Sequence, residues 1–515
     1  MHLSDLITYL ATKPAVSALG FLADDTEENI AHQTLTGLGS DSRQITAGMV
    51  FAALQGSQSD GHDHIDDALA RGAIGVITDD RALDLPEHIA RIVSDDTRLT
   101  YAHSCSYFWP KRPGFIAAVT GTNGKSSIVE YLRQIWQRAS WNSASMGTLG
   151  LRRSAPARPL DPKKALIENT LSLTTPPTER LFQSLNMLAD QNITHLAFEA
   201  SSHGLVQQRL ADTPIHLALF TNLSQDHLDY HDTMDAYFEA KALLFERDLL
   251  PAGQAIIALE DSWGEKLAAR LRGQHCVVTT IGRHKDADFR IDKIEAHDFG
   301  QTIHLEVQGQ SYIYPIALSG DFQAVNALMA AVAAMRSGLS LAESLGALPY
   351  LKPVPGRMQR IHGPAGTGRV VVDYAHTPDA LKVALKAMRA EVSGKLSVVF
   401  GCGGNRDQSK RHLMGEVAAQ LADEIIITDD NPRHEDPAAI RADILKACPE
   451  ADEISPRDLG IKTAIDKLGP DDGLLIAGKG HETVQMIGHE TLPFDDAAIA
   501  RNALAAAAQS EEARR

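Results

Sequence analysis

One segment of the sequence combines the residue types that bind the phosphate groups of a nucleotide. Ala118-Val-Thr-Gly121-Thr-Asn-Gly124-Lys125-Ser126-Ser127 follows an apolar run and precedes a helical pattern. Glycines let backbone N–H groups face phosphate oxygens, a helix start adds partial positive charge, and Lys125 supplies a mobile full charge. A hydroxyl such as that of Ser126 can ligate Mg²⁺. The segment therefore predicts an ATP site made by Gly121, Thr122, Asn123, Gly124, Lys125, Ser126 and Ser127.

This loop departs from the generic GxxxxGK[ST] pattern, which would have glycine where the chain has Val119. A plain glycine-rich turn between strand and helix is the alternative. Two further polar residues follow apolar runs. Glu199 ends one run, where a carboxylate can hold Mg²⁺ at the phosphates of ATP or simply cap a turn. His227 lies in a His/Asp-rich loop with His231, so it is either a metal ligand or a structural histidine.

The elements that must position these residues alternate between strands and helices. Expected strands are Phe115–Val119, His195–Phe198, His216–Phe220, Val370–Val372, Leu396–Phe400, Glu424–Ile427 and Leu474–Ala477. Short, continuous apolar runs are typical of parallel strands buried on both faces. Ile128, Leu132, Ile135 and Trp136 share one helical face after the phosphate loop. The fold class is α/β, in which ligands bind beyond the carboxyl ends of the strands.

Two proline-containing joints divide the 515 residues into three expected domains. They are Trp109–Pro113 and Lys352–Gly356, which cannot continue a helix. The expected domains are 1–112, with short strands at Met49–Ala53 and Ala73–Thr78, then 113–352 and 353–515. The last residues, from Ala503, are expected to form a helix that frays.

Charge and cysteine content exclude several classes of protein. A formal net charge of −17 argues against nucleic acid as a partner. The four cysteines lie far apart without a CxxC pair, which disfavours a zinc site or a disulfide framework. No signal peptide and no apolar run long enough for a bilayer is visible. We therefore expect a cytoplasmic protein without membrane insertion.

Several motifs resemble those of the Mur ligase family, whose phosphate loop, like that of the related folylpolyglutamate synthetases, has the shorter form GTNGK[ST]. They occur in the order of that family across the second and third regions. They are Glu199-Ala-Ser-Ser-His203, Asn222-Leu-Ser-Gln-Asp226-His227-Leu-Asp229, Ala240-Lys241, Gly320-Asp-Phe-Gln-Ala-Val-Asn326, Pro355-Gly-Arg357 and Asp373-Tyr-Ala-His376-Thr-Pro378. Within the family, Asp41-Ser42-Arg43, Thr174-Thr175-Pro176 and Asp430-Asn431-Pro432-Arg433 resemble the member that adds meso-diaminopimelate to UDP-N-acetylmuramoyl-L-alanyl-D-glutamate.

The resemblance implies three α/β domains, which bind a uridine nucleotide, bind ATP, and form a C-terminal Rossmann-like domain. It also implies amide-bond formation through an acyl-phosphate, with Mg²⁺ as cofactor and ATP as co-substrate. We expect a monomer. The implied catalytic residues are Lys125, Glu199, His227, Lys241 and Arg357. Ser126, Glu199, His227 and a carbamylated Lys241 would hold Mg²⁺, while Asn326 and Asp373 would contact adenine and ribose. By periodicity alone Lys241 would be a solvated helix lysine, and His376 would only cap the following helix.

Two further residue sets follow from the resemblance alone. The nucleotide-sugar acceptor would contact Ser40, Ser42, Ser57, Gln58, Ser59, Thr174, Thr175, Ser201, Gln207 and Arg209. Diaminopimelate would contact Arg406, Asp430, Asn431, Pro432, Arg433, Gly478 and Glu482. A guanidinium at position 433 suits the second carboxylate of diaminopimelate, which lysine lacks. A lysine-adding ligase, a folylpolyglutamate synthetase-like ligase and an ATP-binding regulatory module remain the alternatives.

Overall fold

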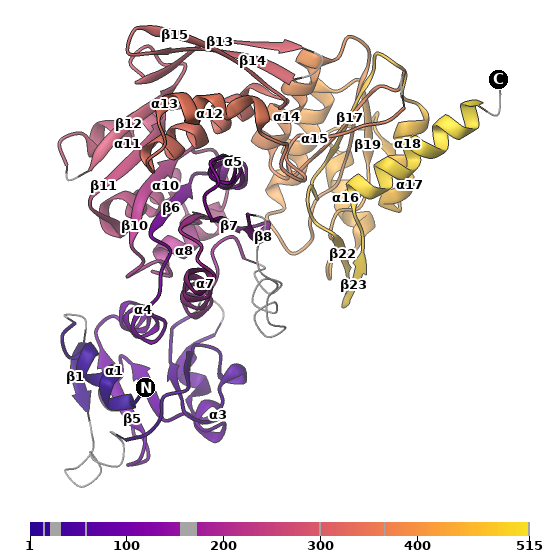
Figure 1. Cartoon of the computed structure of the whole chain (residues 1–515). Coiled ribbons are helices and arrows are strands. Elements are labelled where there is room, and N and C mark those ends of the chain that lie inside the picture. The colour runs from indigo at the N-terminus through magenta and orange to yellow at the C-terminus, as the bar shows by residue number, and fades with distance from the viewer. Residues whose placement is uncertain are drawn as a thin grey trace. The chain divides into compact units, whose positions relative to one another are not determined.

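The computed structural model describes residues 1–13, 16–20, 32–56, 59–154, 173–274, 276–297, 300–364 and 366–512 (Figure 1). The chain forms two compact units. The first unit combines Met1–Thr120, Ser140–Ala218 and Glu239–Gly253, and the second combines Gly121–Ala139, Leu219–Phe238 and Gln254–Arg515. Each unit is described by itself. The expected domain limits at 112/113 and 352/353 stay predictions.

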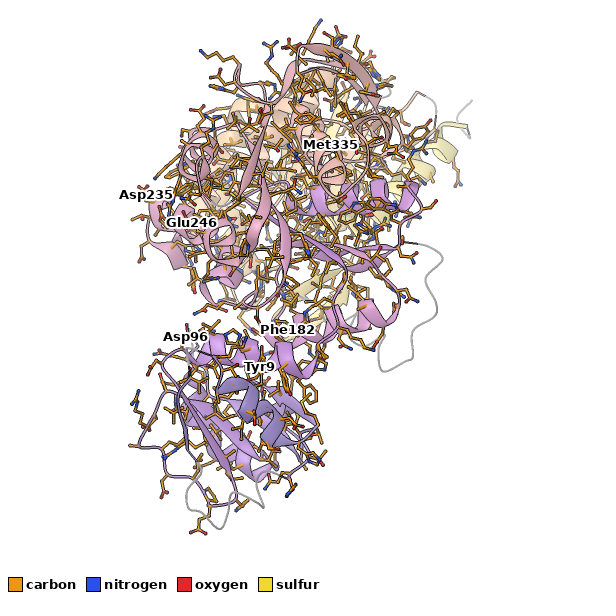
Figure 2. All side chains as sticks on the ribbon, turned by 60° about the vertical axis from the view of Figure 1, so that its left-hand side comes forward. Tyr9, Asp96, Phe182, Asp235, Glu246 and Met335 are labelled. Carbon is orange, nitrogen blue, oxygen red and sulfur yellow. The ribbon has the colours of Figure 1, made fainter. Side chains whose placement is uncertain are left out.

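The first unit begins with a five-stranded sheet in the order β1-β5-β4-β3-β2. Its strands are β1 (Val16–Gly20), β2 (Gly37–Gly39), β3 (Met49–Ala52), β4 (Gly75–Thr78) and β5 (Ala90–Ser94). Strands β2 to β5 are parallel, and β1 is antiparallel to β5. Helix α1 (Leu3–Leu10) contacts α4 (Thr97–Phe108) through the stacked rings of Tyr9, labelled in Figure 2, and Tyr107, 4.4 Å apart. The two strands expected in this region are confirmed.

A second group of strands in the first unit has the order β10-β6-β9-β7-β8. These strands are β6 (Phe115–Thr120), β7 (Ser143–Gly147), β8 (Gly150–Arg153), β9 (His195–Glu199) and the first residues of β10 (Ile215–Phe220). Strands β6, β9 and β7 are parallel, as their buried apolar sequences predict, and β8 pairs antiparallel at the edge. Helices α7 (Thr178–Asp190) and α8 (Ser202–Val206) connect them. The carboxyl ends of β6, β7 and β9 therefore lie at one edge.

The second unit contains a further group of strands in the order β15-β14-β13-β12-β11. Their bounds are β11 (Leu249–Ala258), β12 (Val277–Gly282), β13 (Phe289–His297), β14 (Gly300–Val307) and β15 (Gln310–Ile316). Strands β11 to β13 are parallel, whereas β13 to β15 form an antiparallel meander that the sequence analysis did not predict.

Helix α5 (Lys125–Arg138) packs against α12 (Asp321–Arg336) in this unit. Its predicted apolar face, from Ile128 to Trp136, is fully buried. Tyr131 donates a hydrogen bond to Gln323 (3.0 Å), and the indole of Trp136 donates to Ser337 (2.8 Å). Six of the 16 residues of α12 are alanines, whose small side chains permit close packing.

The last sheet, also in the second unit, has the order β16-β17-β21-β18-β19-β20. Its strands are β16 (Gln359–Ile361), β17 (Arg369–Asp373), β18 (Leu396–Phe400), β19 (Glu424–Ile427), β20 (Asp452–Glu453) and β21 (Gly473–Ala477). All but β16 run parallel, and the four strands expected from the sequence are confirmed.

Helices cover both faces of this last sheet. One apolar core contains residues of α14 (Pro378–Glu391), α15 (Ser409–Leu421) and α16 (Pro437–Leu445). The opposite core contains residues of α17 (Arg457–Asp466) and α18 (Asp496–Glu512). The expected C-terminal helix is thus confirmed, although it begins earlier than predicted, and its predicted fraying at 513–515 lies outside the described residues. Three separate α/β regions confirm the predicted fold class. No described helix is long and apolar enough to cross a membrane.

Candidate functional site

The phosphate loop lies between β6 and α5, as predicted. Lys125 is the first residue of α5, and its ammonium donates hydrogen bonds to the carbonyl oxygens of Gly121 (3.0 Å) and Thr122 (2.7 Å). Gly121 has a φ of 138°, and a side chain there would collide with the Thr221 hydroxyl. Only glycine fits this position. The lysine is therefore folded over its own loop, where a phosphate would otherwise receive its charge.

A second loop, after β10, holds the phosphate loop in place. The Asn123 amide donates to the Asn222 side chain (3.0 Å), and the Thr221 hydroxyl donates to the Asn123 carbonyl (2.6 Å). Thr122 and Ser224 exchange two hydrogen bonds (3.0 and 3.2 Å). These hydrogen bonds hold the two loops against each other.

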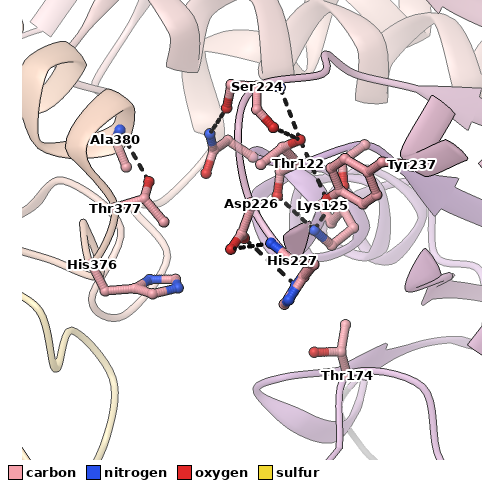
Figure 3. Close-up of polar contacts among 12 residues, drawn as sticks. Thr122, Lys125, Thr174, Ser224, Asp226, His227, Tyr237, His376, Thr377 and Ala380 are labelled. Carbon is pink, nitrogen blue, oxygen red and sulfur yellow. Dashed lines mark hydrogen bonds and ion pairs between the residues drawn. The ribbon is translucent and has the colours of Figure 1, made fainter. Parts of the chain in front are cut away.

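Asp226 lies in this second loop beside His227, with their charged atoms 3.5 Å apart (Figure 3). Burial opposes ionisation of Asp226, but His227, His376 and Lys125 hold its pKa below the usual range. His227 itself adopts a φ of 54° and keeps its side chain half exposed. The sequence analysis gave Asp226 no role. Its place directly before a proposed metal-binding histidine was the available signal.

His376 points toward Asp226 in Figure 3 and does not cap the following helix. Thr377 caps α14 instead, because its hydroxyl accepts the amide of Ala380. The sequence-based interpretation of His376 was therefore wrong. Its Nδ1 lies 2.9 Å from the Tyr374 carbonyl, and burial lowers its pKa. The imidazole thus has a fixed orientation with Nε2 left for other partners.

Arg357 connects the phosphate loop to the last sheet. Its guanidinium donates to the Ser126 hydroxyl (3.1 Å) and lies over the Tyr374 ring, 4.3 Å from the centroid. Burial raises the pKa of the adjacent Asp373, whose carboxylate accepts the amide of Met358 (2.7 Å). Asp373 therefore fixes the turn that carries Arg357. Burial also raises the pKa of Tyr374 to about 12.

A cavity of about 430 Å³ lies beside these residues in the second unit. Asn326, Asn222 and Phe322 line it together with Arg283 and Lys386. Its size is that of a small-molecule site. Asn326 approaches Gly124 closely, because a Cβ at 124 would lie 2.6 Å from its amide oxygen. The structure thus brings Asn326 to the phosphate loop, together with Lys125 and Ser126.

In the first unit, Glu199 ends β9 and is almost fully buried. Its carboxylate accepts the amide and the hydroxyl of Thr148 (2.9 and 3.1 Å). A side chain at Gly147 would collide with this carboxylate. Thr148 escaped the sequence analysis because its motif carries no distinctive pattern. Glu199 is thus a fixed carboxylate at a strand end rather than a helix cap.

Lys241 is also buried, with 1% of its surface exposed, on α10 (Met234–Leu243). The periodicity-based expectation of a solvated lysine was therefore wrong. Burial disfavours an ammonium, which makes this position chemically suited to a modified or deprotonated lysine.

The described residues could supply only a few of the ligands of a Mg²⁺ ion. Among the residues that the structure describes, no three His, Cys, Asp or Glu side chains form a metal-binding group. Mg²⁺ usually keeps several waters and binds one or two carboxylates plus substrate phosphates. The hydroxyl of Ser126, the buried carboxylate of Glu199 and the imidazole of His227 are donors of that kind. The first two are held by the contacts described above.

Four residues expected to bind the nucleotide-sugar acceptor form one network in the first unit. Thr175 donates to the Glu199 carbonyl (2.9 Å) and accepts the amide of Ser201 (2.8 Å). Arg209 donates to the Thr175 carbonyl (2.7 Å) and to Gln207 (2.7 Å).

The other residues expected to bind the nucleotide-sugar acceptor make fewer contacts with this network. Thr174 lies 3.3 Å from the Thr148 hydroxyl. Ser42 is buried, Ser40 half-buried, and Ser59 bonds to His64 (2.7 Å). Ser57 and Gln58 lie outside the described residues. The structure thus connects Thr174 to the Thr148–Glu199 contacts and gives Ser40, Ser42 and Ser59 no such link.

The residues expected to bind the amino acid meet at the carboxyl edge of the last sheet. They lie in the loops after β18, β19 and β21 and are Arg406, Asp430, Asn431, Pro432, Arg433, Gly478 and Glu482. Asn431 donates to Glu482 (2.7 Å), and Arg433 donates to the Gly404 carbonyl (2.8 Å). Arg433 has a φ of 54°, and burial, with the nearby Arg406, lowers its pKa. Between β21 and Glu482 stands Lys479, a fully buried residue that the sequence analysis passed over.

Known protein families match almost the whole chain. The Mur ligase family, catalytic domain, matches residues 34–118. The Mur ligase middle domain matches residues 119–334, and the Mur ligase, glutamate ligase domain, matches residues 356–480.

Two relatives are UDP-N-acetylmuramoyl-L-alanyl-D-glutamate–2,6-diaminopimelate ligases. That of Bradyrhizobium diazoefficiens is 42% identical over 98% of this chain and 99% of its own length. That of Mesorhizobium japonicum is 42% identical over 91% of this chain and 95% of its own. A solved structure of such a ligase is 34% identical, with a TM-score of 0.66, covering 95% of this chain and 98% of that one. A Mycobacterium tuberculosis folylpolyglutamate synthase, 18% identical with a TM-score of 0.61 over 74% of this chain and 92% of its own, shares the fold alone.

Proposed function

This chain belongs to the Mur ligase family, and from that premise we infer that it joins meso-diaminopimelate to UDP-N-acetylmuramoyl-L-alanyl-D-glutamate with cleavage of ATP. The observation that carries this inference is the near-full-length identity with ligases of that name. The contacts in the pocket around Arg433 and Glu482 support the choice of amino acid.

The reaction has two chemical steps. A carboxylate of the acceptor attacks the γ-phosphorus of ATP, which gives an acyl-phosphate and ADP. The amine of diaminopimelate then attacks the acyl carbon, the phosphate leaves with the bond electrons, and the amine gives up a proton. Lys125 would move from its two carbonyl partners onto the transferring phosphate. Arg357, already on Ser126, would add a second cation there.

Mg²⁺ would neutralise phosphate charge when bound. Ser126, Glu199, His227 and Lys241, the last as a carbamate, would hold it. Asn326 and the cavity beside it would take the adenine, and Asp373 would act mainly by fixing the turn that carries Arg357. The acceptor would bind the connected residues Thr175, Ser201, Gln207 and Arg209, with Ser40, Ser42, Ser57, Gln58, Ser59 and Thr174 as further contacts.

Arg433 would select the amino acid. Its guanidinium is half-buried, donates to the Gly404 carbonyl, and experiences the charges of Asp430 and Glu482. The distal end of diaminopimelate carries an ammonium and a carboxylate, so it satisfies both Glu482 and Arg433. The distal end of lysine leaves the guanidinium without an anion, which is costly in a desolvated site. Because ATP and a UDP-linked substrate are the proposed reactants, we expect the protein to act in the cytoplasm, and we expect a monomer.

The test is phosphate release with ATP and the UDP-muramoyl-dipeptide acceptor, comparing diaminopimelate with lysine. We expect a preference for diaminopimelate of roughly a hundredfold or more in kcat/KM. Lys125→Ala should abolish release and change the melting temperature little, because both hydrogen bonds of its ammonium described above are to carbonyl oxygens of its own loop. Equal use of lysine would favour the lysine-adding alternative. Release with a folate acceptor but not with this one would favour the folylpolyglutamate synthetase-like alternative.

A further inference from the structure

Lys479 links the two loops that carry the amino-acid pocket. Its ammonium lies 3.0 Å from the Asn431 amide oxygen and 3.0 Å from Glu482 Oε2. Asn431 donates its own N–H to the same Oε2, at 2.7 Å. The three side chains therefore form a closed triangle between the loop after β19 and the loop after β21.

The burial of this lysine is complete, whereas that of its partner is not. The Lys479 side chain is 0% exposed, while 29% of the Glu482 side chain is exposed. A fully desolvated ammonium needs an anion and hydrogen bonds, which Glu482 and Asn431 supply. The ring of Phe494 lies 6.0 Å from the ammonium on another side. Lys479 is thus covered and touches no ligand, whereas Glu482 still faces solvent.

Lys479 also changes the charge balance of the pocket. Arg433 experiences two carboxylates, Asp430 and Glu482, and one further cation, Arg406. Lys479 adds a positive charge next to these groups through its ion pair with Glu482. Its replacement by a neutral residue would remove that charge and leave Glu482 without its ion-pair partner. A pocket with excess positive charge favours a ligand end that also carries a carboxylate and disfavours one that carries an ammonium alone.

We propose that Lys479 is a positioning and specificity-determining residue, which fixes Glu482 and Asn431 and makes the pocket select an amino acid whose distal end bears both an ammonium and a carboxylate. This inference rests on the proposed function. Lys479 acts through Glu482, since it is covered by protein.

The test uses Lys479→Met, which keeps the side-chain length and removes the charge. The matched control is Lys462→Met, because Lys462 pairs with Asp458 on the surface of α17 and is 52% exposed. We expect the KM for diaminopimelate to rise about tenfold or more in Lys479→Met, with kcat changed much less. The ratio of kcat/KM for diaminopimelate over lysine should fall about tenfold, while the control keeps both values.

A cycle with Glu482→Gln separates this role from a structural one. If Lys479 acts through Glu482, the loss of selectivity in the double variant should be smaller than the product of the two single losses. The double variant also leaves no unpaired buried charge, so it keeps the test valid where Lys479→Met folds poorly. A lower melting temperature with unchanged selectivity in either variant would overturn the proposal.

Direct binding distinguishes this proposal from the proposed function. Calorimetric titration of each amino acid into the protein with a non-hydrolysable ATP analogue needs no turnover. Weaker binding of diaminopimelate to Lys479→Met supports the role of Lys479, even if the proposed acceptor is wrong. Equal binding to wild type and variant refutes it, even if turnover proceeds as proposed.

Discussion

Gly147 leaves just enough space for the Glu199 carboxylate, so a single methyl group can test the proposed metal ligand. In Gly147→Ala the new Cβ would lie 2.2 Å from Oε1 and 2.5 Å from Cδ and Cγ of Glu199, so the carboxylate would have to leave its contacts with Thr148. We expect about a hundredfold lower turnover and a higher Mg²⁺ requirement, because a misplaced ligand costs far more than the fold loses. The measurement is ATP turnover against Mg²⁺ concentration, with melting temperature alongside.

The control for that substitution is Gly346→Ala, at the end of α13 (Leu341–Gly346). No atom lies within 4 Å of a Cβ at position 346. Its turnover and Mg²⁺ dependence should equal those of the wild type. An unchanged Mg²⁺ dependence in Gly147→Ala would remove Glu199 from the metal site.

Lys241 offers a second residue-scale test. If the buried amine is a carbamate that holds Mg²⁺, Lys241→Ala should lose most activity, and added acetate or formate should restore part of it. Mass measurement of the intact active protein should show the added carboxylate. A plain ammonium in active protein would contradict the carbamate.

At the residue scale, motifs indicated the groups proposed to bind phosphate or the amino acid, because each has a distinctive type and spacing. Lys125 and Arg433 are examples. Groups that act through a neighbour were missed, since Lys479 and Thr148 owe their roles to a contact across two loops. For Lys241 periodicity alone gave a solvated side chain, whereas the family resemblance implied a modified, buried one, because helical periodicity does not reveal which side chains the rest of the fold covers.

At the element scale, a group of aromatic side chains lies at the amino ends of β6, β9 and β10. It makes the stability of the fold depend on pH in a predictable direction. His195 stacks on Trp141, with ring centroids 4.3 Å apart, and lies near Phe115 and His216. Burial and His216 lower the pKa of His195 to about 4. His216 accepts the Ile116 amide through Nδ1 (3.1 Å), and burial lowers its pKa as well.

The direction of the pH effect on stability follows from the pKa of His195 in the folded and unfolded protein. Between pH 6.5 and about 4, His195 is protonated in the unfolded chain but neutral in the folded protein. The free energy of unfolding therefore falls as the pH falls through this window. After allowance for partial exposure, the loss is about 1–2 kcal/mol. His195→Phe should remove it while keeping the stack. Urea unfolding at pH 7 and pH 4.5 measures this, with His412→Gln on the exposed face of α15 as control. Equal losses in wild type and His195→Phe would refute the assignment.

Parallel strands were predictable because burial on both faces leaves continuous apolar runs such as Leu396–Phe400. The antiparallel meander β13 to β15 was not, since it lacks such runs: polar and charged residues interrupt all three strands, and much of β13 and β15 is exposed. Polar residues such as Arg290 and Glu306 pair across these strands, and that pairing appears only in three dimensions.

At the scale of the whole molecule, the chain divides into two compact units. Glu199 and Lys241 belong to the first unit, whereas Lys125, His227 and Arg433 belong to the second. The sequence could assign each residue to a helix, strand end or loop but not to a unit, because the chain passes between the units several times. Compactness depends on contacts between distant segments, which no local pattern encodes.

One buried ion pair ties the end of the chain to the second unit. Arg457 and Asp496 are both fully buried, with two hydrogen bonds of 2.7 and 2.8 Å. Removing one partner strands the other charge, so Asp496→Ala should lower the free energy of unfolding by about 3–5 kcal/mol. Arg457→Met with Asp496→Leu should cost much less. Calorimetry should show the loss in the transition of the second unit, and equal losses in single and double variants would contradict the pairing.

The left-handed backbone at Arg433 implies a trade-off between stability and function. An L-residue at a φ of 54° costs roughly 1 kcal/mol that glycine would not. Arg433→Gly should therefore make the protein more heat-resistant and less discriminating at once. If variants were selected only for thermostability, glycine would be enriched at position 433. The selected proteins would fold normally but would discriminate less between amino-acid substrates. The same reasoning applies to His227, whose φ is also 54°.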